Sequence, residues 1–175
     1  LRLSADTIPS RGVVTLPGDF RLVNHTEYPR DWNDGALWGG VGLSIAASTG
    51  ALLRWGPVEA AIAPVFTMEQ NEGYPFQRSP AEDFSPYLHR WHGRFIDLPQ
   101  QPGHGTRTRI HPGHSYIRVA ANGFRAGVST ENILWGPARR NALLLSGTAA
   151  GFAHAFVETA EPRDVIIGNV DAQLF

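Results

Sequence analysis

Aromatic and arginine side chains concentrate in one stretch of the sequence, from Gly73 to Phe95. Tyr and Trp rings can stack on the apolar faces of sugars, and guanidinium groups can pair with carboxylates through two parallel hydrogen bonds. This combination suits the binding of an acidic polysaccharide. The same stretch could instead fold on itself, with its rings packed together as a small local core. The residues that we assign here to polysaccharide binding are Tyr74, Tyr87, Arg90, Trp91 and Arg94.

A second candidate segment, residues 31–38, places two tryptophans beside short polar side chains. Trp32 and Trp38 could each stack on a sugar ring. Asn33 and Asp34 could exchange hydrogen bonds with sugar hydroxyl groups. We therefore add Trp32, Asn33 and Asp34 to the predicted polysaccharide site.

Histidine supplies the one pattern that resembles a metal site, with pairs at 89 and 92 and at 111 and 114, and His104 between them. Zinc ligands with such spacing usually lie on a helix or tight turn with further ligands, whereas these pairs fall in Pro- and Gly-rich sequence without a carboxylate at a fixed offset. The chain has no cysteine, which excludes disulfides and cysteine nucleophiles, and it has no Gly-x-Ser-x-Gly motif. We expect no tight metal site, no cofactor and no catalytic activity.

The elements that must position these residues show the two-residue alternation of β-strands. The clearest hairpin turns at Asn122-Gly123, a pair that favours a type I′ turn because both positions need positive φ. A second turns at Gly56-Pro57 and places Glu59 opposite Arg54. In each hairpin one face is apolar and the other carries polar or small residues. The predicted strands are Leu43–Trp55, Val58–Met68 (with a bulge at Pro64), Ser115–Ala121, Phe124–Thr130, Ala153–Thr159 and Val165–Leu174.

Short turns alternate with long connections along the chain, as in outer-membrane barrels. We expect one domain over residues 1–175, with an irregular N-terminal segment at 1–38, a long loop at 71–112 and a second loop at 136–151. The predicted fold class is all-β: an antiparallel up-and-down meander that forms an open, curved sheet, part of an outer-membrane β-barrel. A soluble β-sandwich also alternates and is the competing architecture.

Composition excludes several other classes. The chain has 175 residues and a formal net charge of −1, so no general electrostatic attraction draws it to nucleic acid. No run of about 18 apolar residues occurs, so we expect no transmembrane helix. The longest predicted strands reach the ~9–11 residues that cross a bilayer as tilted barrel strands.

Several short motifs lie along the chain: Tyr28-Pro29, Asn33 to Trp38, Arg54-Trp55-Gly56-Pro57, Ile96 to Gln100, Gly127 to Thr130 and Trp135-Gly136-Pro137. Together they resemble the Wzi-type capsule-assembly outer-membrane proteins, in particular divergent members. The resemblance covers most of the chain from about Asn24 onward, and it implies a large β-barrel that acts as a surface lectin, holds capsular polysaccharide on the cell and performs no catalysis. Members are longer and continue past Phe175, so we expect this chain to be part of a larger barrel.

The sequence thus predicts a monomeric barrel protein of the bacterial outer membrane. Its expected partners are capsular or other surface polysaccharide and outer-membrane lipid, with no nucleic acid. Two alternatives remain: a porin-like transport barrel, and a soluble β-rich, metal-dependent hydrolase that uses the histidines.

Overall fold

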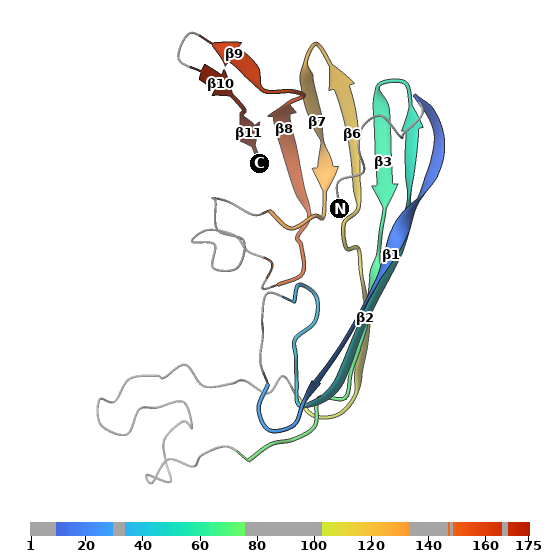
Figure 1. Ribbon diagram of the computed structural model, residues 1–175, viewed down its shortest axis with the longest axis vertical. Helices are drawn as coiled ribbons and strands as arrows, with labels where there is room; N and C mark the ends of the chain where they lie inside the picture. The colour runs from blue at the N-terminus through green and yellow to red at the C-terminus, as the bar shows by residue number, and fades with distance from the viewer. Residues whose placement is uncertain (1–9, 30–33, 76–102, 134–146, 148, 166–167) are drawn as a thin grey trace, which may run out of the picture.

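The computed structural model describes residues 10–29, 34–75, 103–133, 147, 149–165 and 168–175. Over these residues the protein is all-β and contains no helix. Accordingly, none of the described residues forms a helix long and apolar enough to cross a membrane. The strands form an antiparallel sheet that is curved and does not close (Figure 1), which confirms the predicted all-β class and the open sheet.

The strands of the main sheet follow one another as a meander. The long strand β2 pairs with β1 along one edge and with β3 and then β4 along the other, and these two pair in turn with β6 and β5. The sheet continues from β6 through β7 and β8 to the short β11. A separate two-stranded sheet contains β9 and β10. The strands are β1 Arg11–His25, β2 Gly42–Trp55, β3 Val58–Ile62, β4 Val65–Glu69, β5 Arg107–His111, β6 Tyr116–Ala121, β7 Phe124–Ser129, β8 His154–Thr159, β9 Arg163–Val165, β10 Gly168–Val170 and β11 Gln173–Leu174.

The predicted strand Val58–Met68 is divided at Pro64, where we expected a bulge. Proline has no N–H to donate to the ladder, and the neighbouring chain is interrupted at the same level, between β5 and β6. Ser115 joins the two interruptions: its Oγ accepts the Ala63 N–H at 3.0 Å and donates to the Pro112 carbonyl at 2.6 Å. The His114 N–H also donates to the Ala63 carbonyl, at 3.1 Å. These hydrogen bonds therefore keep the strands on both sides of the break in register.

Three sequence-based expectations are corrected. The segment 1–38 is not irregular throughout, because β1 runs from Arg11 to His25 and accommodates Pro17 and Gly18 in a bulge between Leu16 and Asp19. The segment 71–112 is not wholly a loop, because β5 pairs with β4. The predicted strand Val165–Leu174 does not pair as a unit: β10 pairs with β9, and only Gln173 and Leu174 join β8. β1 and β5 are defined by partners on other segments, which local alternation cannot identify. The predicted strand Val165–Leu174 instead turns back on itself, since Gly168 pairs with Val165.

The two ends of the sheet differ in the length of their connections (Figure 1). At the upper end of the view β2 turns into β3 and β6 into β7 through two-residue turns. The second of these has φ 52° at Asn122 and 78° at Gly123, which confirms the positive φ expected at both positions. The long connections between β1 and β2, β4 and β5, and β7 and β8 leave the opposite end.

The interrupted region generates a test of the fold. Gly113 has φ +62°, and a Cβ added there would lie 2.2 Å from the Ala63 carbonyl oxygen. Gly103 has a similar φ of +74° with nothing within 4 Å of such a Cβ. We expect Gly103→Ala to lower the free energy of unfolding by about 1 kcal/mol, the cost of positive φ alone. Gly113→Ala should cost distinctly more, because it also separates the two interrupted strands.

Urea denaturation of the two variants, monitored by far-ultraviolet circular dichroism, measures this difference. Equal losses of stability would mean that the close approach of Gly113 to Ala63 does not contribute to the fold.

Candidate functional site

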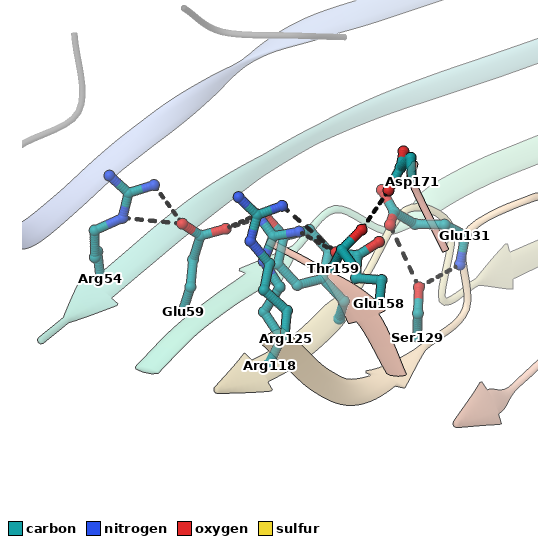
Figure 2. A network of polar contacts seen from close by, with 10 residues as sticks. Arg54, Glu59, Arg118, Arg125, Ser129, Glu131, Glu158, Thr159 and Asp171 are labelled. Carbon is teal, nitrogen blue, oxygen red and sulfur yellow. Dashed lines mark hydrogen bonds and ion pairs between the residues drawn. The ribbon is translucent and has the colours of Figure 1, made fainter. Parts of the chain in front are cut away.

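Glu59 lies at the centre of a charged network on one face of the sheet (Figure 2). Arg54 donates to its Oε2 from Nε at 2.9 Å and also from Nη2. Its Oε1 accepts from Arg118 Nη2 at 2.6 Å and from the Tyr116 hydroxyl at 2.7 Å. Glu59 is only 8% exposed. Two guanidinium groups and a phenol thus surround a carboxylate that is largely removed from water, an arrangement in which charge-assisted hydrogen bonds are strong.

The network continues across the sheet to Glu158. Its Oε1 lies 3.6 Å from Arg118 Nη1 and 3.6 Å from Arg125 Nη1. The charged residues come from five neighbouring strands, β2, β3, β6, β7 and β8, and extend from the same side of the sheet (Figure 2). Three arginines and two glutamates give this group a net charge of +1. Beside it is a hollow of about 370 Å³ next to the Gly56-Pro57 turn, lined in part by Arg54, Glu59, Arg118 and Arg125.

Strand register explains why these side chains meet. Arg54 pairs with Glu59 and Glu59 with Arg118, so the three occupy one row across β2, β3 and β6. Directly opposite residues of antiparallel strands lie on the same face of a sheet, within reach of one another. The predicted placement of Glu59 opposite Arg54 is confirmed. Sequence reasoning did not connect this pair with Arg118 and Glu158, because it paired strands only within hairpins.

The other face of the sheet is apolar and exposed. On β2 to β8 its described positions carry no charged side chain. Large side chains there are open to solvent, for example Ile62 at 68% and Val128 at 53%. The buried apolar side chains Leu52, Ala61 and Phe156 lie on the polar face instead. One row of paired residues crosses six strands without a polar member: Val13, Leu53, Ala60, Ile117, Val128 and Ala155.

Two of the residues predicted to bind polysaccharide lie in the described part of the chain. Tyr74 packs edge-to-face against Tyr28, with ring centroids 5.7 Å apart. Asp34 pairs with Arg21 of β1. The side chains of Tyr74 and Asp34 therefore both contact other residues of the protein. The remaining predicted binding residues, Tyr87, Arg90, Trp91, Arg94, Trp32 and Asn33, lie outside the described residues.

Trp38, a predicted stacking residue of segment 31–38, makes cation–π contacts that the sequence analysis did not predict. The guanidinium carbons of Arg107 and Arg109 lie 4.0 and 4.6 Å from the centre of its ring. Both arginines belong to β5, two positions apart and so on one face of the strand. The alternation Arg-Thr-Arg-Ile-His over residues 107–111 was the available signal, although it is only five residues long.

The described histidines are His25, His104, His111, His114 and His154. Within the described ranges, no set of three or more His, Asp or Glu side chains could hold a metal ion. His89 and His92 are outside these ranges. The expectation that no tight metal site forms stays a prediction.

The central position of Glu59 generates a test of the charged network. Glu59→Gln removes the negative charge between Arg54 and Arg118 and should lower the free energy of unfolding by about 2–4 kcal/mol, because Arg54 loses its carboxylate partner and Arg118 loses the nearer of its two. Glu158→Gln is the matched control and should cost about 1 kcal/mol or less, because its contacts are longer and more exposed. Chemical denaturation of both variants measures the two values. Similar losses would contradict the central role of Glu59.

Comparisons of the chain with protein-family models, with curated proteins and with solved structures give no match. The resemblance to Wzi-type proteins therefore stays a prediction. The two faces of the sheet and the group around Trp38 are the features from which function can be argued.

Proposed function

We propose that this chain forms part of the wall of an outer-membrane β-barrel that holds capsular or other surface polysaccharide on the cell. The observation that carries the proposal is the continuous, exposed apolar face of a sheet whose other face is charged. Exposed apolar patches of this extent mark surfaces that contact lipid or another apolar partner. A sheet with hydrocarbon on one side and water on the other has this distribution.

The length of the strands fits a bilayer. β2 has 14 residues, and β1 pairs with it over nearly its whole length. At about 3.4 Å per residue, 14 residues extend roughly 45 Å. A tilt near 45° reduces this to a little over 30 Å, close to the ~30 Å hydrocarbon core of a bilayer.

Aromatic residues stand at the level expected for one membrane interface. Trp55 and Phe124 adjoin the two short turns, and they are 63% and 50% exposed. Aromatic residues are enriched at the two membrane interfaces of membrane barrels. Phe66, 40% exposed, lies further toward the other end. Trp135, its expected companion at the second interface, is outside the described residues.

The charged face is then the lumenal face of the barrel. Arg54, Glu59 and Arg118 could not face hydrocarbon, since a charged side chain on the lipid side of a barrel is destabilising. In a polar lumen they remain hydrated and paired. Outer-membrane barrels carry their long connections on the outer side of the membrane. In the proposed orientation the end of the sheet from which the long connections leave (Figure 1) faces the cell exterior.

Two adjacent alanines provide a test of the membrane-facing side. Ala47 pairs with Phe66 on the apolar face, and Ala46 pairs with Thr67 and with Arg21 on the polar face. We expect Ala47→Glu to disfavour insertion by about 1–2 kcal/mol, so that the equilibrium constant for insertion falls roughly five- to thirtyfold. Ala46→Glu should insert normally, because its carboxylate faces Arg21 across the strand pair.

Flotation of the full chain with phospholipid vesicles measures the inserted fraction. Equal insertion of the two variants, or flotation of neither the variants nor the unmodified chain, would overturn the assignment of the apolar face to lipid.

The polysaccharide part of the proposal has its own test. A triple variant, Arg90→Ala, Trp91→Ala and Arg94→Ala, removes a possible stacking ring and two possible carboxylate partners. We expect it to assemble in the membrane and to retain several-fold less surface polysaccharide on cells. Unchanged retention with normal assembly would remove Gly73–Phe95 from the binding site.

A further inference from the structure

A single charged side chain interrupts the apolar face of the sheet. Arg11, the first residue of β1, pairs with Trp55 and so lies on the same face as Val13 and Leu53. The other described positions of this face on β1 to β8 carry no charge. A charged side chain on the lipid side of a barrel is costly at the bilayer midplane and costs little at the interface. Arg11 occupies the one row of this face where a charge is compatible with lipid contact.

The charge of Arg11 is not neutralised within the described part of the chain. Its guanidinium carbon lies 5.4 Å from the centre of the exposed Trp55 ring, and no described carboxylate pairs with it. The other arginines near this end, in the charged network, each have a carboxylate partner. A ring supplies no lone pair to the five N–H donors of a guanidinium, so these donors stay available to an anion.

The surroundings of this pair change from polar to apolar along the sheet. Trp55 ends β2 at the Gly56-Pro57 turn, and Arg11 lies beside it at the same end of the sheet (Figure 1). The row that they begin, and the next row below it, continue across the neighbouring strands with apolar side chains only. An amphiphile with its anionic group at Arg11 therefore meets hydrocarbon surface directly below. The first row continues as Val58, Val119, Ala126 and Val157, and the second contains Val13, Leu53, Ala60, Ile117, Val128 and Ala155.

We propose that Arg11 and Trp55 form a contact site for the headgroup of an anionic phospholipid, with the guanidinium on the phosphodiester and the indole at the boundary between headgroup and acyl chains. Arginine donates two parallel hydrogen bonds to a phosphate, and tryptophan is favoured at this depth of a bilayer. A zwitterionic lipid carries its own cation, which competes with Arg11 for the phosphate, so the site selects anionic lipid. The inference rests on the proposed function, in which the apolar face contacts lipid.

The test uses lipids with brominated acyl chains, which quench the fluorescence of a tryptophan only at close range. In the full chain, Trp32→Phe, Trp38→Phe, Trp91→Phe and Trp135→Phe leave Trp55 as the single tryptophan. Quenching in mixed bilayers of phosphatidylglycerol and phosphatidylcholine, with one or the other brominated, gives the relative binding constant of the two lipids beside Trp55. We expect phosphatidylglycerol to be favoured about three- to fivefold at low salt, and less as ionic strength rises.

Variants of Arg11 in this single-tryptophan chain identify the group that selects the lipid. Arg11→Gln should reduce the preference for phosphatidylglycerol to about one, because the amide carries no charge. Arg11→Lys should keep part of it, because an ammonium group keeps the charge and lacks the two parallel donors. The matched control is Arg109→Gln, which removes an exposed arginine from the polar face and should leave the preference unchanged. The quenching of each variant is expressed relative to its own fluorescence in unbrominated lipid.

Equal binding constants for the two lipids, or a preference that persists in Arg11→Gln, would overturn the headgroup site while leaving the lipid-facing assignment intact. A preference that inorganic phosphate abolishes, when sodium chloride at the same ionic strength does not, would also overturn it, because the site would then bind free anions. Absence of quenching by either brominated lipid would contradict the lipid-facing assignment and the headgroup site together. Failure of the proposed barrel and failure of the headgroup contact therefore give different results.

Discussion

The in-register pairing of alternating side chains across β1, β2, β3, β6, β7 and β8 is the constraint on which the rest of the structure depends. Because the side-chain period of a strand is two, each pair places one row of residues on one face and the next row on the other. A slip of β3 by one residue would move Glu59 onto the apolar face, and a slip of β6 would do the same to Arg118. The register is therefore strongly specified wherever the two faces meet different surroundings.

Several local features maintain that register. The Asn122-Gly123 turn links β6 and β7 without an extra residue, since both residues have positive φ. At Pro64 the ladder is broken, and Ser115 bonds to both sides of the gap. On the polar face, Glu59 interacts with side chains from two neighbouring strands. The turn, the hydrogen bonds across the interruption and the contacts of Glu59 thus all stabilise the same register between neighbouring strands.

Arginine and glutamate side chains make different contacts at the two ends of the sheet. Near the short turns, arginines pair with buried or half-buried carboxylates, so their charge is largely neutralised by the protein. At the end with the long connections, Arg107 and Arg109 lie against an exposed indole, and the buried Glu69 binds a backbone N–H instead. The same face of the sheet thus holds a carboxylate network near the short turns and an arginine–tryptophan contact at the other end.

The sequence by itself determined the local part of this architecture. Alternation and turn residues indicated the hairpins around Gly56-Pro57 and Asn122-Gly123, the apolar and polar faces, the Arg54–Glu59 pair and the irregularity at Pro64, because each depends on residues close together in the chain. Only the tertiary structure decided the rest. β1 becomes a strand by pairing along β2 through a bulge, and β5 is stabilised by β4. Trp38 acquires its arginines from a segment about 70 residues away. The alternation of residues along a strand predicts which face of the sheet a side chain occupies. Which side chains it contacts on that face depends on which strands pair, and distant segments come together only in the folded sheet.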